Sequence, residues 1–148
     1  MNLHYDIIVV GGGHAGCEAA AAAASSLGME VSIVNRTPKS AETKPLEAFC
    51  NEFRTSDIII YNIPSPVDGL YKLTDEDCRG GWEARPKFIL EANYRNPSFT
   101  PELIRYILNA NPKVEFVDGK VWLLYQAVTG YEIFTGETPD LEEMRKVI

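Results

Sequence analysis

Hydrophobic residues along this chain fall mainly into short continuous runs bounded by turn-forming or polar residues. These runs predict five strands, at residues 5–10, 31–34, 58–61, 87–92 and 114–117. Continuous apolar runs of this length are typical of strands buried on both faces, as in a parallel sheet. Start and stop signals predict helices at residues 14–27, 100–110 and 121–134, a short helix after Thr74 and a last helix capped by residues 138–140.

The alternation of strands and helices indicates an α/β fold with a doubly wound parallel sheet and C-terminal helices. We expect the strand order 3-2-1-4-5, in which residues 58–61 form the third strand and residues 87–92 the fourth. Ligands bind to such sheets where the strand order reverses. The site is therefore predicted over the carboxyl ends of the first and fourth strands. No break in composition marks a second domain, so residues 1–148 are predicted to form one domain.

Two prolines interrupt the segment between the second and third predicted strands. Pro38 is suited to open a helix with Thr37 as its cap. Pro45 cannot lie inside that helix without breaking it. The helix is therefore expected either to be short or to begin again near Leu46.

A cluster of glycines follows the first predicted strand and precedes an alanine-rich helix. Gly11 permits a tight turn out of the strand, Gly13 lets a pyrophosphate approach the backbone, and Gly16 lets the helix pack closely on the sheet. The first N–H groups of the helix then point toward the phosphates. This strand, glycine turn and helix predict a Rossmann-like dinucleotide site. Its expected cofactor-binding residues are Gly11, Gly12, Gly13, His14, Ala15 and Gly16.

The end of the second predicted strand indicates which dinucleotide binds. NAD and FAD, which have a free ribose 2′-hydroxyl, usually meet an Asp or Glu there. This chain offers Asn35, Arg36, Thr37 and Lys39 instead. A guanidinium can bind a 2′-phosphate through paired, charge-assisted hydrogen bonds. The pattern favours NADP over NAD or FAD, with a solvated loop arginine as the alternative interpretation of Arg36.

Composition and charge narrow the remaining possibilities. A net charge of -7 disfavours nucleic acid or an anionic membrane as a partner of the surface as a whole. The three cysteines are widely spaced without a C-x-x-C pair, so no disulfide framework or zinc site is indicated and a cytoplasmic location is expected. The small-residue run at 19–24 is too short to span a membrane. The acidic residues 75–77 are interpreted as helix-start charges and not as a metal site.

The glycine turn resembles a known flavoprotein. Residues 10–20, with the sequence VGGGHAGCEAA, resemble the FAD-binding start of the flavoprotein that modifies tRNA wobble uridine. We find this resemblance over about a dozen residues and nothing like that family downstream. The flavin fold also needs an acidic residue at the end of the second strand, where Asn35 and Arg36 stand. An FAD-binding fragment of this type remains an alternative.

A second resemblance extends over almost the whole length. The chain resembles the C-terminal, NADP-binding domain of shikimate dehydrogenase. Residues 31–37, VSIVNRT, resemble the family segment that implies Asn35, Arg36 and Thr37 around the adenosine 2′-phosphate. Residues 58–64 resemble the strand and loop beneath the nicotinamide, which implies Ile63 and Pro64 as cofactor-binding residues.

Later segments extend this resemblance toward the substrate. Tyr94, Pro97 and Thr100 resemble the family's Tyr-x-Pro-x-x-Thr stretch, with one extra residue before the proline. Residues 118–136 resemble the last segment of the family's C-terminal domain, in which a glutamine contacts shikimate. The resemblance therefore implies Gln126 as a substrate-binding residue and, more weakly, Tyr94. Val121 and Trp122 replace the Gly and Met that the family usually places near the nicotinamide.

The resemblance implies an oxidoreductase that reduces 3-dehydroshikimate to shikimate with NADPH in aromatic amino-acid biosynthesis, or acts on a relative such as quinate. The family's catalytic Lys and Asp belong to an N-terminal domain that these 148 residues do not include. No catalytic residue and no metal site are therefore assigned here. We expect nucleotide binding without turnover by the chain alone, and possible self-association through the exposed docking face. A non-enzymatic nucleotide-binding module is the other alternative.

Overall fold

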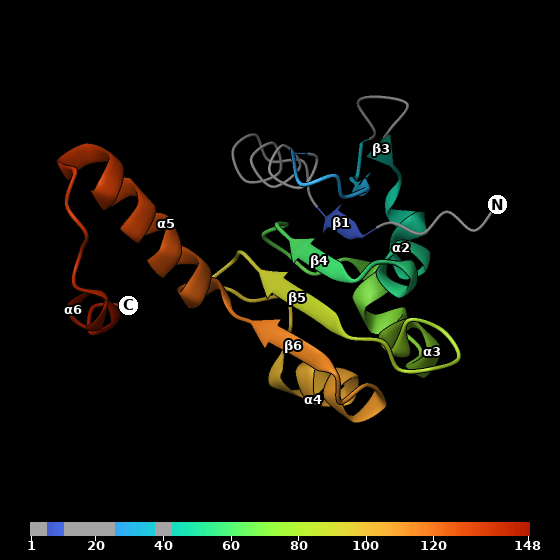
Figure 1. Cartoon of the computed structure of the whole chain (residues 1–148). Coiled ribbons are helices and arrows are strands. Elements are labelled where there is room, and N and C mark those ends of the chain that lie inside the picture. The colour runs from blue at the N-terminus through green and yellow to red at the C-terminus, as the bar shows by residue number, and fades with distance from the viewer. Residues whose placement is uncertain (1–5, 11–25, 38–42) are drawn as a thin grey trace.

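One parallel sheet organises the computed structural model, which describes residues 6–10, 26–37 and 43–148 (Figure 1). The sheet has six strands in the order β3-β2-β1-β4-β5-β6. The strands are β1 (Ile7–Val10), β2 (Val31–Val34), β3 (Thr43–Lys44), β4 (Ile58–Tyr61), β5 (Lys87–Glu91) and β6 (Val114–Val117). All five neighbouring pairs are parallel. The predicted doubly wound α/β fold is confirmed.

The numerical strand order is confirmed, but the residues that fill it differ from the prediction. The third strand is β3, a two-residue strand that pairs with the end of β2. The run at residues 58–61 is therefore β4, and it pairs directly with β1 through Ile7 and Ile58. The order reverses between β1 and β4, so the switch point lies over the ends of these two strands and not over β5. Two residues before Pro45 give too little hydrophobic pattern to predict a strand.

Within the described residues, the helices begin and end close to the predicted signals. The helix predicted at residues 14–27 lies mostly outside the described residues, and so does the helix start predicted at Pro38. Thr74 forms a capping box with Asp77, and Gly80 ends that helix with a φ of 80°. Thr100, Asp118 and Asp140 each accept hydrogen bonds from the first backbone N–H groups of the helix that follows. The helical elements are η1 (Leu46–Ala48), α2 (Phe49–Thr55), η2 (Asp68–Lys72), α3 (Asp75–Arg79), α4 (Pro101–Ala110), α5 (Gly119–Thr135) and α6 (Leu141–Arg145).

The main core lies between one face of the sheet and the helical elements α2, η2, α3 and α4. A chain of aromatic rings runs through it. Tyr61 packs edge-on against Phe49 and Phe99, with ring centroids 6.5 and 5.4 Å apart. Ile7 and Val9 point to the opposite face and form a separate small cluster. Side chains on both faces of β1 are thus buried, as its continuous apolar run predicts.

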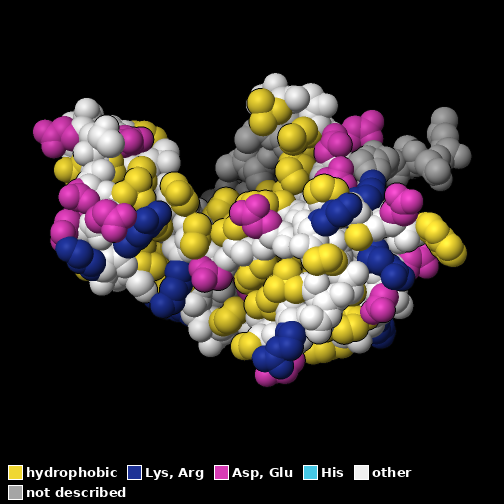
Figure 2. All heavy atoms as spheres, turned by 60° about the horizontal axis from the view of Figure 1, so that its bottom comes forward, with side chains coloured by type: hydrophobic (Ala, Val, Ile, Leu, Met, Phe, Trp, Pro, Cys, Tyr) yellow, Lys and Arg dark blue, Asp and Glu magenta, His cyan; other side chains and the backbone are white. Residues whose placement is uncertain are grey.

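Helix α5 leads away from the sheet, and α6 folds back beside it (Figure 1). Large apolar side chains on α5 are exposed, including Ile133 at 75% and Phe134 at 90%. Figure 2 shows a hollow between this arm and the body of the molecule, with hydrophobic side chains on both walls. Within the part of the chain that the structure describes, no helix combines the length and apolar character needed to cross a bilayer.

Candidate functional site

The parallel sheet places the ends of all its strands on one edge, where several predicted site residues follow the strands directly. Residues 35–37 follow β2, residues 62–67 follow β4, and residues 92–99 follow β5. Binding sites of doubly wound sheets form at this edge. Seven predicted cofactor-binding residues lie outside the described residues, namely Gly11, Gly12, Gly13, His14, Ala15, Gly16 and Lys39.

The turn after β2 is shaped by Asn35. Its backbone N–H donates to the Lys44 carbonyl at 2.9 Å, and its side-chain Oδ1 accepts from the Arg36 N–H at 2.8 Å. The second bond folds the amide side chain back onto its own turn, as Asn side chains often do in turns. Arg36 and Thr37 follow as exposed residues. Asn35 therefore orients the turn that presents Arg36.

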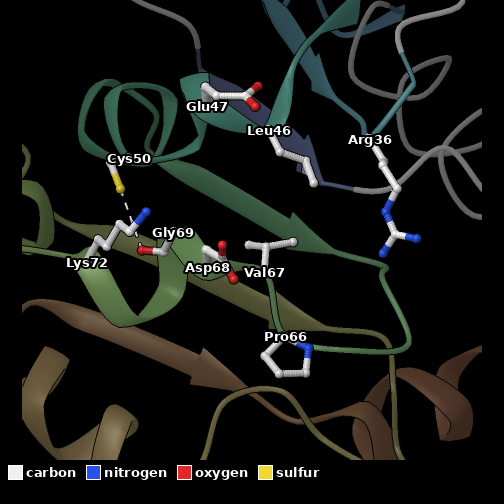
Figure 3. A pocket seen from close by; sticks show the side chains of 9 residues that line it. All are labelled: Arg36, Leu46, Glu47, Cys50, Pro66, Val67, Asp68, Gly69 and Lys72. Carbon is white, nitrogen blue, oxygen red and sulfur yellow. Dashed lines mark hydrogen bonds between the residues drawn. The ribbon is translucent and has the colours of Figure 1, made fainter.

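Arg36 lines a pocket of about 380 Å³, which we call the arginine pocket. Figure 3 shows its guanidinium extending from the end of β2 toward the segment that follows β4. The opposite walls come from η1 and the start of α2 and, on another side, from the segment that leads into η2 and from η2 itself. The lining residues are Arg36, Leu46, Glu47, Cys50, Pro66, Val67, Asp68, Gly69 and Lys72. The pocket therefore joins three segments that are well separated in the sequence.

Charged side chains of both signs surround an apolar floor in the arginine pocket. Arg36 and Lys72 carry positive charges, whereas Glu47 and Asp68 carry carboxylates. Cations suit a phosphate, and the apolar side chains of Leu46 and Val67 suit a flat ring. The pocket thus combines side chains that suit a phosphate and a flat ring with two carboxylates that repel an anion.

Cys50 lines the arginine pocket and carries a thiol that could act as a nucleophile, but its environment favours the protonated form. Burial and the neighbouring charge of Asp77 raise the pKa of the thiol. Its Sγ donates to the Gly69 carbonyl at 3.5 Å. Thiolates, and not thiols, are the reactive species, so this environment disfavours a nucleophilic role for Cys50.

The sequence alone did not identify the walls of the arginine pocket contributed by α2 and η2. An Asp-Gly pair such as Asp68-Gly69 is typical of a turn, but in the structure a Cβ at Gly69 would overlap the ring of Phe49. That close approach lets η2 pack on α2 and brings Lys72 to the pocket. The Asp68-Gly69 pair is the only local signal for this part of the pocket. It indicates a turn, but it does not indicate which strand end that turn lies beside.

A second, smaller pocket of about 220 Å³ lies over the ends of β4 and β5, and we call it the strand-end pocket. It contains the predicted cofactor-binding residues Ile63 and Pro64 together with Asn62, Ala92 and Asn93. The Asn93 amide donates to the carbonyls of Pro64, at 3.3 Å, and Asn96, at 2.6 Å. Asn93 thus links the segments that follow β4 and β5.

The two predicted substrate-binding residues belong to the lining of neither pocket. Tyr94 follows Asn93, is 39% exposed, and accepts a hydrogen bond from Arg95 Nε at 3.1 Å. Gln126 is an exposed residue on α5, the helix that leads away from the sheet (Figure 1). Neither lines the arginine pocket or the strand-end pocket. The structure does not bring them together, and their substrate roles stay predictions.

Gly119 fixes where α5 leaves the sheet. A Cβ at this position would lie 2.5 Å from the Tyr94 nitrogen and 2.7 Å from the Asn93 carbonyl carbon. Only a residue without a side chain lets the start of α5 approach this backbone so closely. The first turn of α5 therefore packs beside the strand-end pocket.

Comparison with family models gives two matches to different parts of the chain. Residues 6–53 match the model of glucose inhibited division protein A, and residues 123–148 match the model of the shikimate 5′-dehydrogenase C-terminal domain. A curated relative, the tRNA uridine 5-carboxymethylaminomethyl modification enzyme of Porphyromonas gingivalis, is 65% identical over 34 residues. That match covers 23% of this chain and 5% of the relative. The flavoprotein resemblance therefore extends beyond the dozen residues recognised from the sequence.

Solved structures similar to this chain include several shikimate dehydrogenases. The Thermotoga maritima enzyme has a TM-score of 0.65 at 18% identity and covers 95% of this chain and 54% of its own. The Thermus thermophilus enzyme, in complex with shikimate, has a TM-score of 0.64 at 25% identity, and the match covers 95% of this chain and 51% of the enzyme. Quinate dehydrogenase from Corynebacterium glutamicum, in complex with NAD, has a TM-score of 0.63 at 18% identity, and the match covers 98% of this chain and 55% of the enzyme.

This chain spans about half the length of these relatives. The fold likeness extends over nearly all of its residues, whereas the family model matches only its last part. Both resemblances recognised from the sequence are confirmed by the matches. The chain has the fold found in about half of a shikimate dehydrogenase, and its residues 123–148 match the C-terminal domain of that family.

Proposed function

We propose that this chain is the NADP(H)-binding domain of a shikimate dehydrogenase. The complete enzyme would reduce 3-dehydroshikimate to shikimate, or act on a related hydroxy acid such as quinate. The observation that carries this proposal is the position of Arg36, which follows β2 and lines the arginine pocket within a sheet of the shikimate dehydrogenase type.

The predicted cofactor fits the residues of the two pockets. The Arg36 guanidinium would supply donors for a ribose 2′-phosphate, whereas the Lys72 ammonium lies at the other end of the same pocket, beside Cys50 (Figure 3). Ile63 and Pro64 line the strand-end pocket, where the opposite end of the dinucleotide would lie. The nicotinamide supplies the hydride chemistry when it is bound. The described residues contribute binding and orientation.

Proton transfer to the developing alkoxide is assigned to a second domain of the family type. General acid–base catalysis needs a group within hydrogen-bond reach of the reacting oxygen, and we assign no residue of this chain to that role. The shikimate and NAD named for the solved relatives are consistent with a small hydroxy acid and a nicotinamide cofactor. By itself the chain is expected to bind nucleotide with little or no turnover.

A comparison of NADP, NAD and FAD in thermal unfolding tests the cofactor. A ligand that binds only the folded state raises its apparent stability by mass action. We expect a larger rise in Tm with NADP than with NAD, and loss of that difference in Arg36→Ala. Arg105→Ala is the matched control, because Arg105 is an exposed arginine on α4 that lines neither pocket. Equal shifts with NADP and NAD in the wild-type chain would reject the proposed role of Arg36.

An FAD-binding role is the second candidate, because residues 6–53 match the model of a flavoprotein family. If this candidate is correct, we expect the purified protein to be yellow and its Tm to rise more with FAD than with NADP. A non-enzymatic nucleotide-binding module is distinguished differently. Mixing this chain with a separately made catalytic domain of the family would restore dehydrogenase activity only if the chain is part of such an enzyme.

A further inference from the structure

Two buried polar side chains stand at the ends of β4 and β5, just before the segments that contribute to the two pockets. Tyr61 is the last residue of β4 and Glu91 the last residue of β5, and they are register partners in the parallel pair. Tyr61 is 0% exposed and Glu91 is 1% exposed. A buried polar group usually costs stability unless it is hydrogen-bonded, so the partners of these groups indicate their role.

The Tyr61 hydroxyl binds the backbone of the segment that follows β4. It donates to the Ser65 carbonyl at 2.7 Å and accepts from the Val67 N–H at 3.0 Å. The segment it holds contributes Pro66 and Val67 to the arginine pocket. The same segment contributes residues 62–64 to the strand-end pocket. One phenol therefore holds the wall between the two pockets.

The Glu91 carboxylate binds the backbone of the segment that follows β5. Its two oxygens accept from the N–H groups of Ser98 and Phe99, the latter at 3.2 Å. These bonds close a loop over residues 92–97, which begins with the strand-end pocket residues Ala92 and Asn93. Burial raises the pKa of this carboxyl, while the two N–H donors act in the opposite direction.

We propose that Tyr61 and Glu91 are positioning residues of the cofactor site. Each holds, through backbone hydrogen bonds, one of the two segments against which a dinucleotide would lie. This inference rests on the proposed nucleotide-binding function. It adds that nucleotide affinity depends on two buried residues that have no predicted contact with the cofactor.

The geometry predicts different consequences for the two residues. The Tyr61 segment lines both pockets, so its release affects the adenosine end and the opposite end of the dinucleotide. The Glu91 segment lines only the strand-end pocket. Loss of the Glu91 interactions should therefore leave binding at the adenosine end unchanged.

Calorimetric titration of Tyr61→Phe and Glu91→Gln with NADP and with adenosine 2′-monophosphate tests these consequences. Tyr61→Phe keeps the ring packing and removes only the hydroxyl. We expect it to weaken both ligands by about 10-fold, the effect of one lost hydrogen bond with an unpaired partner. We expect Glu91→Gln to weaken NADP by about 10-fold and to change the affinity for the monophosphate by less than about 2-fold.

Tyr106→Phe is the matched control. The Tyr106 hydroxyl donates to Asp75 Oδ1 at 2.8 Å and lies 3.2 Å from the Leu73 carbonyl oxygen, but Tyr106 lines neither pocket. Titrations are run well below Tm, where every variant is folded. A merely structural role would lower the Tm of Tyr61→Phe and leave its Kd equal to that of Tyr106→Phe, which would overturn the inference.

Two further results keep this inference distinct from the proposed function. Failure of the wild-type chain to bind any nucleotide rejects the proposed function itself, and with it the dependence of affinity on these residues. Wild-type binding with unchanged affinities in both variants rejects only the positioning role. Hydrogen exchange in the wild-type chain needs no variant: we expect protection of the Val67, Ser98 and Phe99 amides, and rapid exchange at all three would overturn the inference.

Discussion

Lys87 gives the sharpest prediction for stability, because it is a buried cation whose ammonium is bound by backbone carbonyls. The side chain lies at the start of β5 and the residue is 3% exposed. Its ammonium donates to the carbonyls of Phe53 at 2.7 Å, Arg54 at 3.1 Å and Ser56. These carbonyls belong to the end of α2, where a helix leaves acceptors without intrahelical partners. A cation there also interacts favourably with the helix dipole.

Burial, assisted by repulsion from Arg85, lowers the pKa of Lys87 from 10.5 to about 8. In the unfolded chain the lysine keeps its proton up to about pH 10.5. Between pH 8 and 10.5 the unfolded state therefore binds more protons than the folded state, and the free energy of unfolding rises with pH. At about 1.36 kcal/mol for each pKa unit, this displacement corresponds to a rise of about 3 kcal/mol from this group.

Substitution of Lys87 by methionine removes both the charge and the pH dependence. The variant leaves two buried carbonyls, those of Phe53 and Ser56, without the ammonium donor, at about 1–3 kcal/mol each. It also removes the cost of burying a charge, about 3 kcal/mol at pH 7. These effects largely offset each other at pH 7. We therefore expect a small difference at pH 7 that widens in favour of the wild-type chain toward pH 10.5.

Urea unfolding followed by circular dichroism at pH 7, 8, 9 and 10 measures this difference. Buried acids such as Cys78, whose pKa is raised to about 12 by burial, affect both chains. Subtracting the free energy of unfolding of the variant from that of the wild-type chain therefore isolates most of the effect of Lys87. The neutral amine keeps only two donors for three carbonyls, so about 3 kcal/mol is an upper bound. A difference that stays constant or shrinks with rising pH would refute the reasoning.

Two further predictions concern the position of α5 and the charge of the arginine pocket. Gly119→Ala should lower the free energy of unfolding by about 1–3 kcal/mol, because the added methyl overlaps the backbone of Asn93 and Tyr94. Gly130→Ala, with open space around its Cβ position, should instead gain up to about 1 kcal/mol of helix propensity in the same urea assay. Asp68→Asn should strengthen NADP binding several-fold at low salt by calorimetry, and an equal gain for NAD would contradict a phosphate in that pocket.

Much of the fold follows from local patterns in the sequence. The apolar runs of β1, β2, β4, β5 and β6 are long enough to be recognised, and the parallel arrangement follows from their alternation with helices. Helix starts at Thr74 and Thr100 follow from side chains that accept hydrogen bonds from the next turn. Those interactions are local, so the residues that form them are neighbours in the sequence.

The parts that the sequence did not predict depend on contacts between distant segments. Strand β3 is defined by its pairing with β2 and has no hydrophobic pattern of its own. Without β3, the sequence-based prediction places the switch point over the ends of β1 and β5, whereas in the structure it lies over the ends of β1 and β4. Tyr61 was interpreted only as the end of an apolar strand, since nothing local indicates that its hydroxyl binds Ser65 and Val67. Lys87 is similarly defined by carbonyls more than thirty positions away.

The two resemblances of this chain concern different parts of it and make a direct test of the cofactor possible. The flavoprotein model covers residues 6–53, whereas the shikimate dehydrogenase model covers residues 123–148. A glycine turn that admits a pyrophosphate is required by any dinucleotide, so it cannot distinguish FAD from NADP. FAD and NADP also share their adenosine diphosphate part. The difference lies in the ribose 2′-phosphate, which only NADP carries and which we propose that Arg36, a lining residue of the arginine pocket, binds. Adenosine 2′-monophosphate is therefore a more decisive ligand than either complete cofactor, because a flavin site has no reason to prefer it over adenosine 5′-monophosphate.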